Sequence, residues 1–322
     1  MTMIHFPARF ILIAAAAALS ALGQSSNSST IAGAGYLFPA PISVAPGQVI
    51  TVFAKGVGST LKQPVLAGFG SLPTSLAGIS VTLVQAMNIR APILQVSPAT
   101  LCGNCGVMTA ITVQIPYELQ LPPPNGGLGG GVEFFVTESG VAGTWSNLNA
   151  VPDQVHILTV CDTIIGGSGS SSGRCQWEVT HANGLLVSNA NPASVGEELV
   201  AYAVGLGATN PPVPTGQPAT QPTPTAETFR LGFNFQADAL PSAPPFSQVI
   251  PVITFAPIPL FAGLTPGYPG LYQINFVVPG VPAGLPPCVS GQGPNLVNTN
   301  LTVSVVGLTS FDGVAICVSL PQ

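Results

Sequence analysis

Charged side chains are scarce in this sequence, and no part of it is strongly basic. Charged residues make up 5% of the 322 residues, whereas an average soluble domain has about 25%. The six bases are scattered along the chain: Arg9, Lys55, Lys62, Arg90, Arg174 and Arg230. Nucleic acids and anionic lipids are bound by clustered lysines and arginines. The sequence therefore predicts no nucleic-acid partner.

Groups that commonly carry catalysis are also few. The chain has three histidines and 11 acidic residues. Its Gly/Ser-rich segment Gly166–Gly173 reads GGSGSSSG, and we expect it to be too flexible to hold a nucleophilic serine as the strained turn of a Gly-x-Ser-x-Gly motif does. We interpret His156 as an ordinary strand residue, because a catalytic triad also needs a nucleophile held on a strained turn. The carboxylates of Glu133 and Glu138 would fall on opposite faces of a strand. We therefore expect no catalytic residue, no metal site and no cofactor.

Long apolar runs are confined to the N-terminus. Phe10–Leu22 follows Arg9, and small residues precede Gln24, which is the layout of a secretory signal peptide. The run is shorter than the roughly 20 residues of a membrane-spanning helix. We predict a signal peptide at residues 1–23, a flexible lead-in at 24–40, and an exported chain without a membrane span. Extracellular, cell-surface and periplasmic locations all stay open.

Glycine and proline are abundant, with 37 and 34 residues, and this composition disfavours long helices. Short segments of alternating apolar residues separate the turns, as expected for strands. Strands are predicted at Val49–Lys55, Ile79–Gln85, Ala110–Ile115, Val132–Thr137, Val155–Val160, Gln176–Thr180, Glu198–Val204, Phe229–Gln236, Val249–Phe255, Leu271–Val278, Asn300–Val306 and Val314–Val318. Antiparallel β-sandwiches suit such strands. The proline-rich stretch Ala208–Ala226 is interpreted as a long solvated loop.

One pattern occurs twice. Ser43–Gly58 reads SVAPGQVITVFAKGVG, and Asn191–Gly207 reads NPASVGEELVAYAVGLG. Each has a Gly-Gln or Gly-Glu turn, an apolar alternating run and a Gly-x-Gly end. A repeat at this length indicates two related domains. We predict an all-β chain with one β-sandwich at residues 41–180 and a second at 181–322.

Six cysteines are candidates for disulfide bonds: Cys102, Cys105, Cys161, Cys175, Cys288 and Cys317. An even count in an exported chain favours disulfides. Cys161 and Cys175 flank a Gly/Ser-rich loop that a bond would close, and Cys288 and Cys317 both lie late in the second domain. The remaining pair forms Cys-Gly-Asn-Cys, for which we favour a structural disulfide over a redox or zinc site.

Exposed aromatic rings are the best candidates for binding. Trp145 lies in a polar segment, and we name it with Tyr117 and Tyr268 as candidate binding residues, because rings on loops can stack on sugars or apolar partners. Trp177 and Tyr272 are assigned to the core from their strand context. The candidate partners are a polysaccharide or a cell-surface protein.

Several ordered blocks of the chain carry a family resemblance. They include GLYQINFVVP (Gly270–Pro279), the preceding FAGLTPGYP, and GEELVAYAVGLG (Gly196–Gly207). Together with APGQVITVFAKGVG in the first half, these blocks resemble the Solibacter-type uncharacterised C-terminal domain family of acidobacterial secreted proteins. The resemblance covers Ile42 to Val318. It implies secretion and immunoglobulin-like modules of the IPT/TIG type, and it transfers no catalytic residue.

The sequence thus predicts an exported, non-enzymatic protein of recognition, adhesion or scaffolding at the cell surface or outside the cell. The alternative is a secreted hydrolase, or an accessory module, that acts on polysaccharide.

Overall fold

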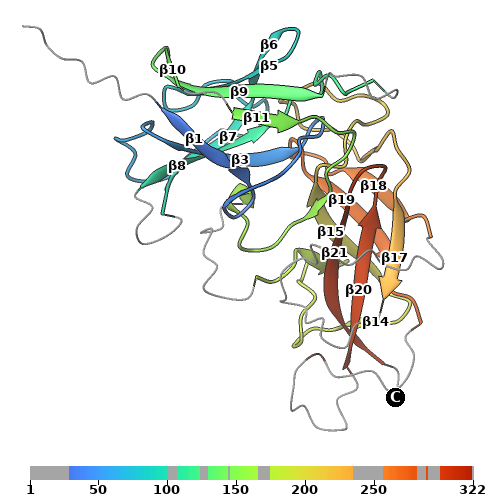
Figure 1. Cartoon of the computed structure of the whole chain (residues 1–322). Coiled ribbons are helices and arrows are strands. Elements are labelled where there is room, and N and C mark those ends of the chain that lie inside the picture. Colours follow the sequence, from blue (N-terminus) through green and yellow to red (C-terminus); the bar gives the residue numbers. More distant parts are fainter. Residues whose placement is uncertain are drawn as a thin grey trace, which may run out of the picture.

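Two groups of β-strands follow one another along the chain (Figure 1). The computed structural model describes residues 29–100, 107–123, 130–143, 146–165, 175–234, 257–280, 288 and 298–320. The predicted signal peptide, Trp145 and the Cys102/Cys105 pair lie outside these described residues, as does the strand predicted at Val249–Phe255.

The first group contains two sheets. Its strands are β1 (Thr30–Gly35), β2 (Pro39–Ala40), β3 (Val49–Lys55), β4 (Val65–Leu66), β5 (Ile79–Val84), β6 (Asn88–Ala91), β7 (Ile93–Ala99), β8 (Met108–Gln114), β9 (Gly131–Glu138), β10 (Val141–Ala142) and β11 (Ser146–Asn149). One sheet has the order β2-β1-β3-β8-β7-β4, and the other has the order β10-β9-β5-β6 with β11 also paired to β9. All the strand pairs in both sheets are antiparallel.

The second group repeats this plan with fewer strands. They are β12 (His156–Ile157), β13 (Val179–His181), β14 (Ala193–Ser194), β15 (Glu198–Val204), β16 (Thr223–Pro224), β17 (Arg230–Asn234), β18 (Phe261–Leu264), β19 (Tyr272–Val277), β20 (Asn298–Val306) and β21 (Phe311–Ser319). One sheet runs β12-β15-β19-β18-β16 with β13 also on β15, and the other runs β14-β21-β20-β17. The short β14–β21 pair is parallel.

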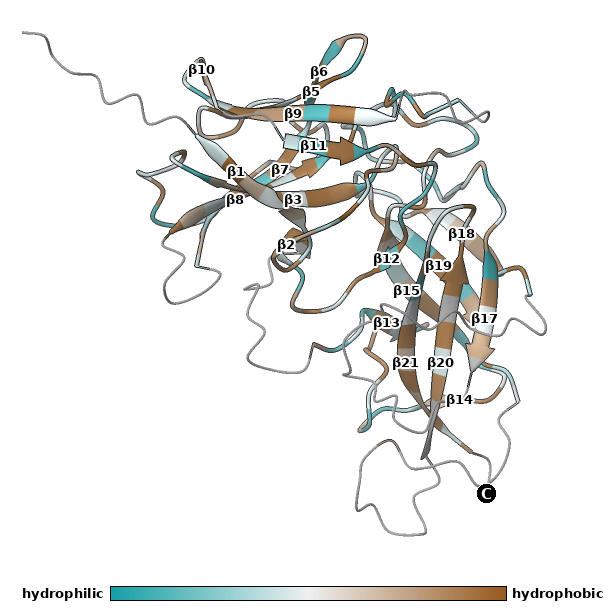
Figure 2. Ribbon diagram, viewed as in Figure 1, coloured by the Kyte–Doolittle hydropathy of each residue, from teal (hydrophilic) through white to brown (hydrophobic). Residues whose placement is uncertain are grey.

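Each pair of sheets encloses its own apolar core. Ile50, Val81 and Phe134 belong to the first core, and Leu199, Tyr272 and Val303 belong to the second. Figure 2 shows a long brown stretch along β3 and alternating brown and pale bands along β20, in keeping with the buried apolar residues of these strands. Two packed antiparallel sheets per domain are the arrangement of immunoglobulin-like modules. The predicted all-β fold with two tandem sandwiches is confirmed.

Strand β3 is buried on both faces, and different parts of the molecule pack against each face. Ile50, Val52 and Ala54 point into the first core. On the other face, Val49 packs on the second domain, whereas Phe53 packs on Met108 and Ala110. A strand with both faces covered carries apolar residues at successive positions.

The strand pairing differs from two predictions: the flexible lead-in at residues 24–40 and the division between the domains at residue 180. β1 and β2 lie within residues 24–40, and β1 hydrogen-bonds to β3 from Thr30 to Gly35. The strands predicted at Val155–Val160 and Gln176–Thr180 appear as β12 and β13, which both pair with β15 of the second group. Strand β1 was not predicted from the sequence, because the small residues of TIAGAG lack the apolar alternation of a typical strand.

The chain passes from one group to the other just after Ala150. Val44 bridges to Ala150 in the first sandwich. The carboxylate of Asp153, which is fully buried, then accepts hydrogen bonds from the backbone N–H groups of Leu308, Thr309 and Ser310. These bonds fasten the connecting segment to the turn between β20 and β21. We therefore propose a domain change near residue 152 in place of 180.

The loops that precede β3 and β15 have the same hydrogen bonds. The N–H of Gly47 donates to Ile115 O at 3.0 Å, and that of Gly196 donates to Val278 O at 2.9 Å. In each loop the next side chain accepts from the N–H three residues earlier, at 2.7 Å for Gln48 and 2.8 Å for Glu197. Both glycines have positive φ, +74° and +83°, which only glycine adopts without strain.

The single helical turn of the described residues is η1 (Thr163–Ile165). No helix in the described part of the chain has the length and hydropathy to span a membrane.

Candidate functional site at the domain junction

A small apolar cluster joins the two sandwiches. Val49 of β3 packs against Leu158 and Val204 of the second group, and all three are at most 3% exposed. Leu94 and Leu271 pack around them as partly buried neighbours. This burial stabilises one arrangement of the two domains, because separating them would return apolar surface to water.

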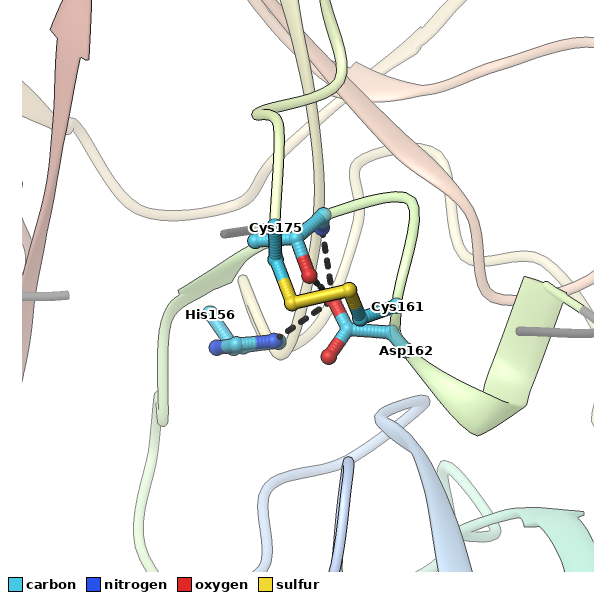
Figure 3. The surroundings of a disulfide bond; sticks show 5 residues. His156, Cys161, Asp162 and Cys175 are labelled. Atoms are coloured by element: carbon cyan, nitrogen blue, oxygen red, sulfur yellow. Dashed lines mark hydrogen bonds and ion pairs between the residues drawn. A yellow bond between two sulfur atoms is a disulfide. The ribbon is translucent and has the colours of Figure 1, made fainter. Parts of the chain in front are cut away.

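A buried polar cluster lies beside these apolar residues, with His156 at its centre. The imidazole stacks on the ring of Tyr36, with centroids 3.7 Å apart and planes at 9°. Its Nε2 lies 3.1 Å from Asp162 Oδ2 and its Nδ1 lies 3.3 Å from Asp312 Oδ2. Figure 3 shows His156 pointing at Asp162 beside the Cys161–Cys175 bond. We call Tyr36, His156, Asp162 and Asp312 the junction cluster.

The junction cluster favours a charged imidazole. Burial alone lowers the pKa of His156, but the hydrogen bonds and charges of Asp162 and Asp312 outweigh it and raise that pKa to about 9. Both ring nitrogens therefore act as donors at neutral pH. His156 lies in strand β12, as the sequence predicted, but its side chain is the centre of a buried polar cluster that the sequence did not predict. Its partners Tyr36 and Asp312 are far away in the sequence, so the local pattern VHILTV held no sign of them.

The predicted disulfide Cys161–Cys175 closes the segment that carries Asp162, and it is present. The next residue, Thr163, reaches into the first sandwich. Its N–H donates to Tyr36 O at 3.0 Å, and its hydroxyl lies 2.8 Å from that of Thr51 in β3. The predicted Cys288–Cys317 bond is also present.

The proline-rich stretch Ala208–Ala226 also joins the domains. The Gly216 N–H donates to Gln114 Oε1 at 2.7 Å, and the Leu72 N–H donates to Gly216 O at 2.8 Å. The Thr215 hydroxyl accepts from the Tyr117 N–H at 2.9 Å. The interpretation of this stretch as a solvated loop is wrong at these positions, because its backbone polar groups find partners on the first sandwich.

Tyr117, one of the candidate binding residues, is engaged within the molecule. Its ring packs against the second core, and its hydroxyl lies 3.2 Å from that of Tyr272. Burial raises the pKa of Tyr117 to about 12, although the hydrogen bond with Tyr272 acts in the opposite direction. Trp177 and Tyr272 are at most 2% exposed, so their assignment to the core is confirmed.

Tyr268, another candidate, lines two neighbouring hollows at the junction. The wider one is about 420 Å³ and is lined by Leu158, Glu178, Tyr202, Thr265, Tyr268 and Leu271. The deeper one is apolar, measures about 120 Å³, and adds Val49 and Leu94 of the first sandwich to its lining. They share Leu158, Tyr268 and Leu271. We call the two together the junction groove.

Backbone hydrogen bonds hold the turn that carries Tyr268 in place. The Gly267 N–H donates to Ala219 O at 2.9 Å, and the Thr265 N–H donates to Leu271 O at 2.8 Å. A Cβ atom on Gly270 would approach Val49 Cγ2 to 2.5 Å, so this glycine allows close contact with the first sandwich. Tyr268 as a whole residue is 58% exposed. An exposed ring on a rigid turn loses little conformational entropy when it binds a partner.

Glu178 gives the junction groove its acidic group. Burial raises the pKa of Glu178, and the nearby Asp162 carboxylate raises it further. Tyr202, which the sequence analysis did not single out, faces the same hollow. Its place in the alternating run ELVAYAV indicated that it shares a face with Glu198, but no sequence signal indicated that this face is hollowed. Among the described residues, no group of three side chains suits a metal ion.

Comparisons with known proteins give remote structural likenesses. No protein-family model and no curated protein matches this chain. The Escherichia coli adhesin FdeC is 13% identical with a TM-score of 0.21, and the match covers 92% of this chain and 65% of that one. The Yersinia pseudotuberculosis adhesin InvE is 12% identical with a TM-score of 0.20, and the match covers 90% and 58%. The chain thus spans less than two thirds of either adhesin.

Proposed function

We propose that this chain is an exported, non-enzymatic recognition or adhesion protein that works at the cell surface or outside the cell. The junction groove carries the proposal, because it presents an exposed aromatic ring on a braced turn between two fixed domains. Loop residues held by a rigid scaffold are common binding elements.

Export is supported by the cysteines. Cys161–Cys175 and Cys288–Cys317 are bonded, and disulfides persist in oxidising compartments. The predicted signal peptide at residues 1–23 agrees with this location. Within this proposal, the family named by the sequence blocks and the duplication of one sandwich remain predictions. The matching loops before β3 and β15 support the duplication.

Binding suits the junction better than hydrolysis. Both nitrogens of His156 face carboxylates, so the imidazole has no free lone pair with which to accept a proton from a nucleophile. A glycosidase needs two carboxylates across its substrate. In the described part of the chain, Glu178 is the one carboxylate that lines the junction groove.

A retention assay tests the proposal. The exported chain, produced with its disulfides formed, is incubated with intact bacterial cells and with insoluble cell-wall and plant polysaccharides, and the release of reducing sugar is followed in parallel. We expect retention on at least one surface without release of sugar. Sugar release would support the hydrolase alternative, and absence of retention on every surface would overturn the recognition function.

A further inference from the structure

We propose that the junction groove and the adjoining outer face of the β15–β19–β18 sheet form a binding site for a neutral glycan. The inference rests on the proposed recognition function and names the ligand class of the same site. Four features carry it: two aromatic rings, a row of fixed amides, the charge of the lining, and the size of the hollow.

The aromatic rings give the site its apolar surfaces. Tyr268 and Tyr202 line the same hollow from two elements, the turn before β19 and strand β15. Sugar rings have apolar C–H faces that pack on aromatic side chains, while the phenol oxygen stays available for hydrogen bonding. A tyrosine pair therefore suits an amphipathic ring better than a purely apolar ligand.

A row of side chains with fixed orientation continues from the hollow across the sheet. Tyr202 is directly opposite Gln273, and Val200 is opposite Asn275, so each pair shares a face. Gln273 Nε2 donates to Asn275 Oδ1 at 3.3 Å, and Asn275 Nδ2 donates to Glu198 Oε1 at 3.2 Å.

At the other end of this row, the Thr265 hydroxyl lies 3.4 Å from Gln273 Oε1. Each bond in the row fixes the direction of an amide. Planar amides and carboxylates of known direction match the paired hydroxyl groups of a sugar, which both donate and accept hydrogen bonds.

Charge selects an uncharged glycan. Glu178 lines the hollow and Glu198 ends the amide row. No lysine or arginine lines either hollow in the part of the chain that the structure describes. A uronate, sulfate or phosphate group would approach these carboxylates without a positive partner, and like charges repel at this range.

The size of the hollow also fits. Its volume of about 420 Å³ lies within the roughly 300–1,000 Å³ of small-molecule sites. Strands β15 and β19 lie side by side over six paired positions (Figure 1), so a chain of several sugar units has a sheet face to follow beyond the hollow. The smaller apolar hollow, which Tyr268 lines together with Leu94 and Val49, can accept a methyl group or a C–H edge.

Titration calorimetry on the full exported chain tests the site. The probes are the neutral hexasaccharides of glucose, xylose and mannose, with hexagalacturonate as the acidic probe. We expect at least one neutral probe to bind and the acidic probe to bind at least tenfold more weakly. Tyr268→Ala should weaken the binding of the neutral probe at least tenfold. Phe69→Ala is the control for loss of an exposed ring, because Phe69 is fully exposed and lines neither hollow, so its removal should leave binding unchanged.

Each other outcome overturns the inference. These outcomes are absence of binding by all three neutral probes, tighter binding of hexagalacturonate, and unchanged binding in Tyr268→Ala. Equal urea midpoints of the wild type and both variants exclude a folding defect, as expected for exposed rings. If the wild type and Tyr268→Ala are retained equally on cells, the glycan site fails while the recognition function stands. If neither is retained on any surface, both fail.

Discussion

The loops before β3 and before β15 are alike in backbone and unlike in surroundings. Gly47 and Gly196 occupy the same turn position with similar positive φ angles. The first loop faces the domain junction, where Gln48 is fully buried and its amide donates to the Tyr36 hydroxyl at 2.7 Å. The second loop lies away from the junction, and Glu197, with 27% of its side chain exposed, pairs with His181.

This difference shows how one turn can serve two purposes. In both loops the side chain after the glycine caps a backbone N–H of its own turn. In the first loop the same side chain also reaches the junction cluster through Tyr36, whereas in the second it forms a local ion pair near water. The junction loop should therefore be much more sensitive to substitution than its counterpart, and four predictions follow the comparison in order of size.

Removal of the central imidazole should have the largest effect. His156→Ala leaves the carboxylates of Asp162 and Asp312 buried without their counter-charge, which typically costs about 3–5 kcal/mol. His181→Ala is the matched change at the second loop, and we expect about 1–2 kcal/mol because Glu197 keeps access to water. Urea denaturation at pH 7 measures both. Equal midpoints for the two variants would contradict a special role of the junction cluster.

Raising the pH should weaken the same cluster more gently. The pKa of His156 is about 9 in the folded protein and 6.5 as its ordinary value. Because the folded pKa is the higher one, the stabilisation is complete below pH 6.5 and is lost as the pH rises through about 9. The loss should be on the order of 3 kcal/mol at most. Urea midpoints between pH 6 and 10 should show this fall in the wild type and a smaller one in His156→Gln.

The next prediction compares the stability costs of alanine at the two turn glycines, Gly47 and Gly196. A Cβ atom on Gly47 would approach Tyr117 Cε1 to 2.2 Å, whereas one on Gly196 meets nothing within 4 Å. Gly196→Ala should therefore cost only the positive-φ penalty of about 1 kcal/mol. Gly47→Ala adds a clash with a ring that packs between the domains and should cost about 2–4 kcal/mol. Thermal unfolding of both variants checks this, and a cost for Gly196→Ala as large as that for Gly47→Ala would remove the contrast.

Single hydrogen-bonding groups should give the smallest effects. Tyr36→Phe removes the acceptor of the buried Gln48 amide and should cost about 1–2 kcal/mol. Glu197→Gln keeps an oxygen for the Ser194 N–H and weakens a partly exposed ion pair, for which we expect less than about 1 kcal/mol. The two variants can be compared by urea midpoint at pH 7. A larger loss for Glu197→Gln would reverse the assignment of the buried and exposed loops.

Local sequence determined much of the scaffold. Apolar runs rich in β-branched and aromatic residues marked β3 and β15 with their observed bounds. Burial alternates along β15, whereas β3 is buried on both faces. Cysteine position and compartment were enough to pair Cys161 with Cys175 and Cys288 with Cys317. The Gly-Gln and Gly-Glu turns were visible as a repeated pattern because a positive φ requires glycine at a fixed place.

Only the tertiary structure decided what occupies the junction. The strand that contains His156 was assigned to the wrong sandwich, because β12 is just two residues long and its pairing with β15 is a long-range choice. Tyr117 and Tyr268 look alike as loop tyrosines, yet one packs between the domains and the other lines a groove. A junction brings together residues that are distant in the sequence, so its packing and charge pairing have no local pattern, and only the folded chain determines them.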